Sequence, residues 1–557
     1  MNCITRRAGF VTGLFVLLQA FAVVPAFAAL NVTIGQNFLG TAFQTNNQSG
    51  IPPDVNGAIG PQHFVELLNG SFAAYDRTDP TIVFRESDVD FWFNAGVSLA
   101  SDQAITDPRI IYDPLSQRWF ASMVDFDANA TDPTVEANDF LLAFSATSDP
   151  TGDWVGFRFR ADTTTNHAFA DFPTLGVDSN AVYLSGNMFK GGDNNIGPNL
   201  VSIPKADLLN TNIGTRTYFG VLDPAVYGWV LQPATCFDAT NSGAILSMGN
   251  IGSDSDLHSN IFTFRVLGSS QTNATLSTPV NITVSPYFCP DNPDMGFPIF
   301  NPTQPDGTML LEANDPRFSA KVYNVGGVLY GVHNTEFNSR IAIQWYRVNA
   351  TNGVLLEQGM ISDPNLDLFF PSIAASRAGT VVIGCNGSSI NTYVSSFAYV
   401  GQTVNGTTTF GSPLLLQSGS VSYHGIDELY LSSDPVPESR WGDYSATSLD
   451  PVDPTHFWTI QMFPSDQDPD LDFGIWSTQV TELIAAQPLP QLAIAPAGTN
   501  VLISWPSSAA GFQLQSNTNL VSAASWMPVS QTLSTNGNVI SVLVPESGSQ
   551  QFFRLIQ

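Results

Sequence analysis

The sequence of 557 residues predicts an all-β protein, and three observations lead to this class. Short apolar or alternating stretches recur along the chain, bounded by Gly, Pro, Asn and Asp, as in strands joined by tight turns. Amphipathic helical periodicity is nearly absent. Between residues 53 and 483 a two-strand unit recurs seven times, a self-similarity that separates a ring of blades from a single sandwich. We therefore expect a β-propeller of seven blades, followed by a small C-terminal β-sandwich.

Each repeated unit opens with an Asp or an aromatic residue before Pro or a small residue, and continues into an apolar strand and a second strand. A four-stranded blade is too small to be stable alone and covers its faces with its neighbours around a ring. A string of β-sandwiches is the alternative, but no ends of independent domains are visible between residues 53 and 483. The units open at residues 53–58, 107–114, 171–178, 229–236 (the weakest), 315–318, 370–374 and 440–446.

One stretch between two predicted strands is close to the Asp-box hairpin of sialidase-type propellers. Thr147, Asp149 and Trp154 stand at positions one, three and eight of that motif, although Gly152 is one place late. In such a hairpin the Asp side chain binds backbone amides of the turn. The stretch therefore predicts the turn that joins the last two strands of a blade, and it carries no catalytic role.

The N-terminal residues have the features of a signal peptide. Arg6 and Arg7 precede an apolar run over residues 10–24, and Ala26 and Ala28 are the small residues that signal peptidase recognises. The run is short for a membrane span of roughly 20 residues, so a membrane anchor is the weaker alternative. We expect residues 1–28 to be cleaved, and the product to be secreted or cell-surface protein without a membrane span. The Sec and Tat routes both stay open.

Composition divides the mature chain into two domains. We assign residues 29–484 to the propeller, residues 485–490 (AAQPLP) to a linker, and residues 491–557 to a β-sandwich of the immunoglobulin or fibronectin type III kind. In this last part the only ionisable side chains are Glu546 and Arg554. Its strands are predicted at residues 491–494, 500–505, 512–515, 526–529, 539–544 and 551–555.

The charge of the chain is low and one-sided. Only 12% of the residues are charged, and 19 Lys and Arg stand against 48 Asp and Glu, which gives a net charge of −29. Proteins that bind nucleic acids neutralise phosphates with basic side chains, so the composition excludes that class. The six histidines lack the spacing of metal ligands, and phosphate-binding, zinc and serine-nucleophile motifs are absent.

Several longer stretches resemble known families. The chain resembles a family of large secreted bacterial β-propeller proteins over roughly residues 50 to 480. The resemblance is carried by the segment 52–173 and by the short motifs at 148–154 and 440–445. The tail, with VLISWP, FQLQS and the terminal FFRL, is similar to C-terminal modules of secreted proteins from verrucomicrobia-like bacteria. The resemblance implies an extracellular propeller with an Ig-like module. It implies no catalytic residues, because the family has no settled activity.

Charged residues recur where the innermost strand of a blade would begin. In a propeller these positions face one mouth of the central channel, where three arginines could clamp a carboxylate or sulfate. The alternative is that each arginine pairs with the aspartate two or three residues away and only fixes the start of its strand. The candidate ligand-binding residues at this mouth are Asp54, Asp107, Arg109, Asp171, Asp315, Arg317, Arg440, Asp443 and Tyr444.

Two further kinds of site are suggested by residue type. Alternating carboxylates suit a structural Ca²⁺, although a solvated acidic loop is the simple alternative; the candidates are Asp466, Asp468, Asp470 and Asp472. If a disulfide forms, we expect it between Cys236 and Cys289, since export permits oxidation. Cys385 lies in an apolar strand and is expected to be a core residue.

The leading functional hypothesis is an exported binding protein. Its expected ligand is a glycan, because of the aromatic-rich, acidic composition, with extracellular proteins next. The alternative is a glycoside-active enzyme, a sialidase-like exo-glycosidase or a polysaccharide lyase, that uses the channel mouth. A structural component of the cell surface is the third possibility. An enzyme needs the three arginines to converge beside an unpaired carboxylate, whereas a binding module needs exposed aromatic residues on one face.

Overall fold

The structure is a computed structural model, and it describes two compact units, residues 31–487 and residues 488–557. The predicted signal peptide lies outside the described residues. The residues not described are 1–29, 44–49, 165, 193, 241–242, 252–256, 291–300, 308–309, 426–437, 469–473, 487–489, 508–511, 520–525, 538, 547–549 and 557.

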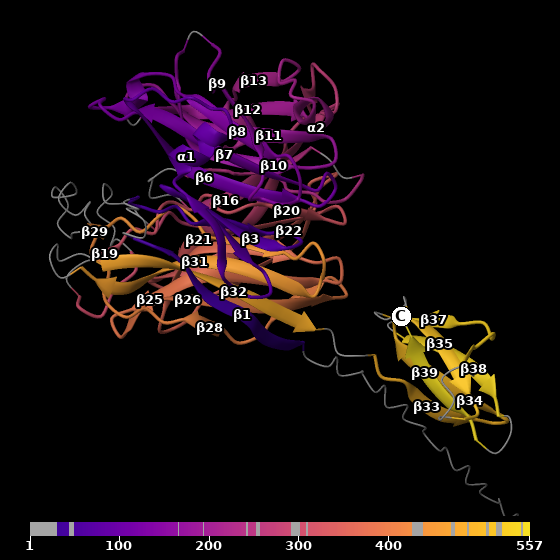
Figure 1. The fold of residues 1–557 in the computed structure, drawn as a ribbon. Coiled ribbons are helices and arrows are strands. Elements are labelled where there is room, and N and C mark those ends of the chain that lie inside the picture. The colour runs from indigo at the N-terminus through magenta and orange to yellow at the C-terminus, as the bar shows by residue number, and fades with distance from the viewer. Residues whose placement is uncertain are drawn as a thin grey trace, which may run out of the picture. The chain divides into compact units, whose positions relative to one another are not determined.

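The larger unit contains seven antiparallel sheets in chain order, which confirms the predicted seven-bladed propeller (Figure 1). Blade 1 has β2 (Asn56–Ile59), β3 (His63–Leu68), β4 (Ser71–Asp76) and β5 (Ile82–Glu86). Blade 2 has β6 (Gln103–Asp113), β7 (Arg118–Asp127), β8 (Asp139–Ser145) and β9 (Trp154–Arg160). Blade 3 has β10 (Phe169–Val177), β11 (Ala181–Phe189), β12 (Asn195–Pro204) and β13 (Thr217–Val221).

The remaining blades follow the same plan, with the first strand innermost. Blade 4 has β14 (Trp229–Pro233), β15 (Ala244–Met248), β16 (His258–Leu267), β17 (Thr275–Leu276) and β18 (Val280–Tyr287). Blade 5 has β20 (Tyr323–Val325), β21 (Val328–Phe337), β22 (Arg340–Asn349) and β23 (Leu355–Ile361). Blade 6 has β24 (Asp367–Ala375), β25 (Thr380–Ser389), β26 (Thr392–Val404), β27 (Thr407–Phe410) and β28 (Leu414–Gln417). Short helices α1 (Asp88–Asn94), α2 (Lys205–Leu209) and α3 (Pro224–Tyr227) lie between strands, and β19 (Leu310–Leu311) pairs with β29 (Glu438–Ser439).

Blade 7 closes the ring with strands from both ends of the unit. It contains β30 (Ala446–Leu449), β31 (His456–Gln467) and β32 (Gly474–Ala486), and its outer strand is β1 (Asn31–Ala42). Strand β1 pairs with β32 along its length, from Asn31 opposite Ala486 to Ala42 opposite Ser477. The sequence did not predict this closing strand. The pairing also extends β32, so Ala485 and Ala486 belong to a strand and not to the linker in which we had placed them.

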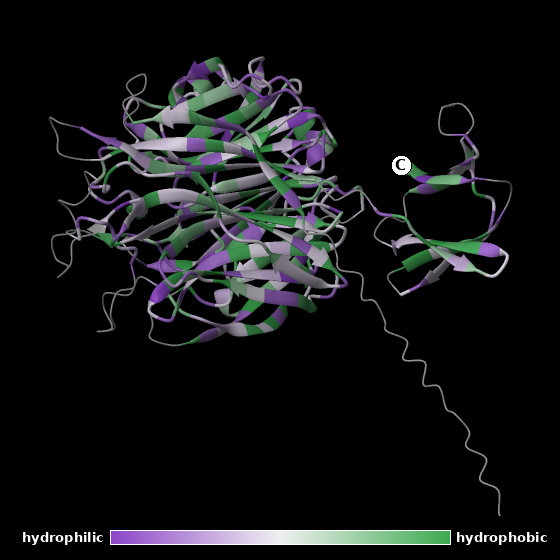
Figure 2. Ribbon diagram, turned by 90° about the horizontal axis from the view of Figure 1, so that it is seen from below, coloured by the Kyte–Doolittle hydropathy of each residue, from purple (hydrophilic) through white to green (hydrophobic). Residues whose placement is uncertain are grey.

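Apolar clusters fill the junctions between neighbouring blades. Val65 and Leu67 of blade 1 pack with Trp119 and Met123 of blade 2, and further clusters join the following pairs of blades. Figure 2 shows apolar stretches along strands throughout the unit. Because every blade covers its faces with its neighbours, each junction contributes to the stability of the whole ring.

Several innermost strands carry a bulge with a residue of positive φ. Such residues are Asp54, Asp107, Phe172, Val230 and Phe370, with φ between 45° and 62°. The strand register shifts at the last four of these positions. A bulge re-aims the side chain that follows it. The side chains two residues after these four make hydrogen bonds to innermost segments of neighbouring blades; they are Arg109, Thr174, Gln232 and Ser372.

The hairpin between β8 and β9 is the turn that the Asp-box-like stretch predicted. Asp149 Oδ1 accepts hydrogen bonds from Thr151 N at 3.0 Å and Thr151 Oγ1 at 2.8 Å, and Trp154 Nε1 donates to Pro150 O at 2.9 Å. This turn joins the last two strands of blade 2, as expected.

The C-terminal unit is a β-sandwich of two sheets, whose layers are visible in Figure 2. One sheet contains β33 (Ala493–Ala497), β34 (Asn500–Pro506), β38 (Val539–Pro545) and β37 (Ser534–Asn536); the other contains β36 (Met527–Pro528), β35 (Gln513–Asn517) and β39 (Phe552–Ile556). Ile503, Trp505, Leu514, Ile540 and Val542 fill the space between them. Strand β37 is the one strand here that the sequence did not predict.

One expectation is corrected by the fold. Cys236 and Cys289 are not bonded to each other, so the disulfide we considered is absent. Cys236 follows the innermost strand of blade 4 and Cys289 follows an outer strand of the same blade, and three strand spacings of about 4.8 Å exceed the reach of a disulfide. Among the described residues, no helix is both long and apolar enough to cross a membrane.

Candidate functional site at the channel mouth

The propeller topology gathers the sequence-predicted residues at one mouth of the channel. Every blade begins with its innermost strand, so the starts of these strands lie at the same end of the ring. Carboxylate oxygens of Asp54, Asp107 and Asp443, from blades 1, 2 and 7, lie within 4.8 Å of one another. We call the predicted residues, together with Glu312, Asn69, Asn314 and Phe172, the channel-mouth cluster.

The three central carboxylates of this cluster are buried and hydrogen-bonded. Asp54 accepts from Asp443 N at 3.1 Å and from Asn69 Nδ2 at 2.9 Å. Asp107 accepts from Phe172 N at 2.9 Å, and its own amide donates to Asn69 Oδ1 at 3.0 Å. These bonds join the turn between β3 and β4 to blades 2, 3 and 7. Sequence reasoning missed Asn69 because it lies in a turn and not at the start of a strand.

Two of the arginines pair with carboxylates close to them in sequence. Arg317 Nη2 lies 2.6 Å from Asp315 Oδ2, and Arg317 Nε donates to Asp315 Oδ1 at 2.8 Å. Arg440 Nη2 lies 2.6 Å from Asp443 Oδ1, while its Nη1 lies 2.9 Å from Glu312 Oε2. Arg317 and Arg440 therefore form the local pairs with nearby aspartates that the sequence offered as the alternative to an anion clamp. Glu312 follows the short strand β19, and no motif marked it.

Arg109 is arranged differently and crosses the channel. Its guanidinium lies 3.6 Å from the ring centroid of Tyr444 and 4.8 Å from that of Phe172. Arg109 Nε donates to Pro173 O at 2.8 Å and Nη1 donates to Ser319 O at 2.9 Å. Tyr444 in turn donates to Pro108 O at 3.0 Å. Blades 2, 3, 5 and 7 are thereby joined through one buried side chain.

Burial and neighbouring charges shift the pKa values of the cluster's carboxyl groups in opposite directions. Burial, and then the neighbouring Asp443, raise the pKa of both Asp54 and Asp107 above the ordinary value. Burial alone would also raise the pKa of Asp443, but Arg440 and then Arg317 hold it below the ordinary value. The arginines therefore stabilise the charge of Asp443, while burial makes Asp54 and Asp107 easier to protonate.

Asp171 is the carboxyl group best placed to meet a ligand. It is half-buried on β10 and has no hydrogen bond to its side chain among the described residues. Burial, and then the charge of Asp107, raise its pKa to about 7. At neutral pH this side chain can act as either donor or acceptor.

We expect Asp171 to give the propeller a characteristic dependence of stability on pH. A folded-state pKa of about 7 lies above the unfolded value of about 3.9, so the protonated form is stabilised by folding. This contribution is complete below about pH 4 and is lost as the pH rises through 7. The free energy of unfolding of Asp171→Asn, relative to wild type, should increase between pH 5 and pH 8 in urea titrations. The exposed Asp79→Asn serves as control, and a pH-independent difference for Asp171→Asn would contradict the assignment.

The predicted acidic loop follows β31 of blade 7. Asp466 is the last but one residue of β31, where its Oδ1 accepts from Gln467 N at 2.8 Å, and Asp468 follows the end of the strand. Asp470 and Asp472 lie outside the described residues. A second described group with metal-like spacing is Asp450, His456 and Glu482. Its members are already engaged, since His456 Nδ1 lies 2.7 Å from Glu482 Oε1 and Asp450 pairs with Arg77 at 2.5 Å.

The comparisons with known proteins find only distant similarity. No protein-family description and no curated protein match the sequence. Among solved structures, α-L-arabinofuranosidase Arb93A from Fusarium graminearum, as a mutant with an iminosugar inhibitor, is 10% identical; the match covers 80% of this chain and 97% of that one, with a TM-score of 0.38. Hsv2 from Kluyveromyces lactis is 9% identical over 77% and 98%, with a TM-score of 0.34. Trypanosoma rangeli sialidase with sialic acid is 10% identical over 79% and 54%, with a TM-score of 0.29.

These similarities assign no function to this chain. The topology itself defines the class: a seven-bladed β-propeller, closed by its N-terminal strand and followed by a β-sandwich.

Proposed function

We propose that the chain is an exported extracellular or cell-surface binding protein whose channel mouth holds a polar ligand, a glycan in the first place and an extracellular protein in the second. The observation that supports this proposal is the arrangement of the cluster. Six carboxyl groups and three guanidinium groups meet there, and Arg440, Glu312 and Asp171 keep part of their surface open. Such a rim offers donors and acceptors in alternation, which suits a ligand with many hydroxyl groups.

The pairing of the acids argues for binding over catalysis. Glycoside hydrolysis uses two carboxyl groups on either side of the scissile bond. Asp54, Asp107 and Asp443 are buried, and Asp315 and Glu312 are held by arginines. Asp171 alone among the cluster's carboxyl groups has neither a salt bridge nor a hydrogen bond in the described residues. Asp171 could fill one of the two carboxyl roles of glycoside hydrolysis, but the cluster offers no candidate for the other.

Aromatic platforms contribute little to the proposed site. Among the described residues, the large exposed aromatics are Phe93, Phe337 and Tyr393, on α1, β21 and β26. They belong to three different blades and do not mark one face. The aromatic face that we named as the signature of a binding module is therefore not what supports the proposal; the polar rim of the mouth supports it.

We expect binding to depend on the rim residues. The mature protein would be screened on a glycan array and against secreted and surface proteins, and any ligand titrated by calorimetry. Removing one charged contact should lower the affinity about tenfold or more, so Asp171→Asn and Arg440→Gln should each weaken binding. Asp79→Asn, on an exposed turn of blade 1, should leave it unchanged. The proposal would be overturned if neither rim variant changed the affinity for the ligand, or if the screens found no ligand.

A glycoside-active enzyme is the second candidate, and one observation favours it. A carboxyl group with a pKa of about 7 is suited to act as a general acid at neutral pH. Asp171 would donate its proton to the leaving oxygen of a glycoside. Release of reducing ends or aryl leaving groups, lost in Asp171→Asn while folding is retained, would decide for this candidate over binding alone.

A further inference from the structure

Two buried basic side chains inside the channel have no carboxylate within salt-bridge distance among the described residues, although the charge of Arg109 acts on Asp107 and Asp443. Arg109 is 2% exposed and Lys321 is 6% exposed, and neither takes part in a salt bridge among the described residues. Lys205 provides the contrast, because it is equally buried and its Nζ lies 2.7 Å from Asp113 Oδ2. Buried charges are normally paired, since leaving one unpaired costs several kcal/mol.

Several donors around these cations also lack a partner among the described protein atoms. They are Arg109 Nη2, Asn56 Nδ2 and the hydroxyl of Ser319, each on a side chain that is at most 2% exposed. Lys321 Nζ makes one hydrogen bond, to Gly57 O at 3.3 Å, and has protons left to donate. Buried polar groups without partners call for an explanation.

These donors lie in one section of the channel. Arg109 Nη1 donates to Ser319 O, and Lys321 follows Ser319 by two residues. Lys321 Nζ donates to Gly57 O, the neighbour of Asn56 in the innermost strand of blade 1. Burial, and to a smaller extent the nearby charge of Arg109, lower the pKa of Lys321 to about 7. The amine is therefore partly neutral at pH 7, and a bound anion would favour its protonated form.

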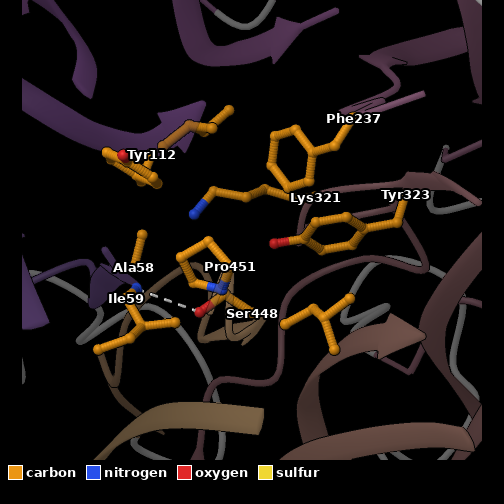
Figure 3. Close-up of a pocket in the computed structure, with 10 residues that line it drawn as sticks. Ala58, Ile59, Tyr112, Phe237, Lys321, Tyr323, Ser448 and Pro451 are labelled. Carbon is orange, nitrogen blue, oxygen red and sulfur yellow. Dashed lines mark hydrogen bonds between the residues drawn. The ribbon is translucent and has the colours of Figure 1, made fainter. Parts of the chain in front are cut away.

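The end of Lys321 also points into a small cavity. Figure 3 shows its amine directed into the space between Tyr112 and Ala58, with the Tyr323 hydroxyl and Ser448 nearby. The cavity volume of about 10 Å³ is close to the minimum for one water-sized occupant. The space is far too small for a sugar or a sulfate. Of the donors named above, Lys321 alone lines it, so this cavity lies beside the end of Lys321 and not between the four side chains.

We propose that this section of the channel binds one small monovalent anion of about the size of chloride, held by Arg109, Lys321, Asn56 and Ser319. An anion would pair both cations at once and accept from donors that the protein leaves without partners. It would also hold blades 1, 2 and 5 together at the axis. The site shares Arg109 with the channel-mouth cluster, but Lys321, Asn56 and Ser319 lie outside that cluster, and a test through Lys321 does not depend on the proposed function.

Thermal unfolding in sodium chloride against sodium gluconate at equal ionic strength tests this proposal. For wild type, each tenfold rise in chloride should raise the Tm by about 1–3 °C relative to gluconate. Lys321→Met should remove that response. Lys205→Met, which removes the paired and equally buried lysine, should lower the Tm but keep the response. A response that survives in Lys321→Met, or is missing in wild type, would overturn the proposal.

A second measurement covers the case in which Lys321→Met does not fold. Crystals of the wild-type protein grown in bromide should give an anomalous peak within about 3.5 Å of both Arg109 Nη2 and Lys321 Nζ. Formate in place of bromide would tell whether a small carboxylate can replace a halide. Water alone at that position would show that the donors are hydrated and that the section holds no anion.

Discussion

Deletion of β1, residues 31–42, should abolish the cooperative folding of the propeller. The strand completes blade 7, and without it β32 becomes an unpaired edge. Thr41, fully buried at the end of β1, donates its amide and its hydroxyl, the latter at 2.8 Å, to the carboxylate of Glu66 in blade 1. We expect a loss of at least about 5 kcal/mol, comparable to the total stability of many domains, measured by urea unfolding of the truncated protein.

Glu66 provides the point-mutant version of the same test. Besides Thr41, its carboxylate accepts from the hydroxyl of Tyr75 at 2.8 Å and from that of Thr478 in blade 7. Glu66→Ala should cost about 3 kcal/mol or more because several buried donors lose their acceptor, whereas the exposed Asp79→Asn should cost little. Unchanged unfolding after deletion of β1 would show that the ring is closed in another way.

Loss of Asp443 should be the most damaging single change at the channel mouth. Asp443 is the anion that Arg440 contacts at 2.6 Å and to which Asn314 Nδ2 donates at 3.2 Å, and Arg317 and Arg109 also act on its charge. Asp443→Ala leaves these buried cations short of a counter-charge, so we expect a cost of about 3–5 kcal/mol. Chemical unfolding at pH 7 would measure it.

A matched double variant separates the loss of the ion pair from a general packing defect. Arg440→Met removes the main partner of Asp443, so the effects of Asp443→Ala and Arg440→Met should not add when combined. Fully additive effects would mean that the two side chains do not interact. In that case the ion pair described between Arg440 and Asp443 would be wrong.

The sequence was informative wherever a local pattern repeats. Each blade opens with a recognisable innermost strand, and for that reason the number of blades was predicted correctly. The same pattern named Asp54, Asp107 and Asp443, whose carboxylate oxygens lie close together. Asn69 and Glu312 were missed because a turn and a connecting segment carry no repeated signal. The predicted disulfide between Cys236 and Cys289 was wrong. The export compartment and the sequence spacing of the cysteines do not reveal that one follows an inner strand and the other an outer strand.

The closing strand was beyond local reasoning for a different physical reason. Residues 31–42 alternate as a strand should, but their partner lies about 450 residues later, and such pairing depends on the assembled ring. Gly40 lies at the contact between β1 and β32, where a Cβ would lie 2.3 Å from Thr478 Oγ1. In the isolated sequence this glycine could equally mark a turn or a bulge.

The most direct test of the closed ring is an engineered cross-link between its two ends. Thr33 and Ile484 are paired across β1 and β32, and paired positions of antiparallel strands lie within the reach of a disulfide. In the variant Thr33→Cys with Ile484→Cys, mass spectrometry should find near-complete disulfide formation and the Tm should rise. Thr33→Cys combined with Leu356→Cys, an exposed position on blade 5, should form none. Reduced thiols in the first pair, in folded protein, would contradict the closure on which the channel-mouth cluster depends.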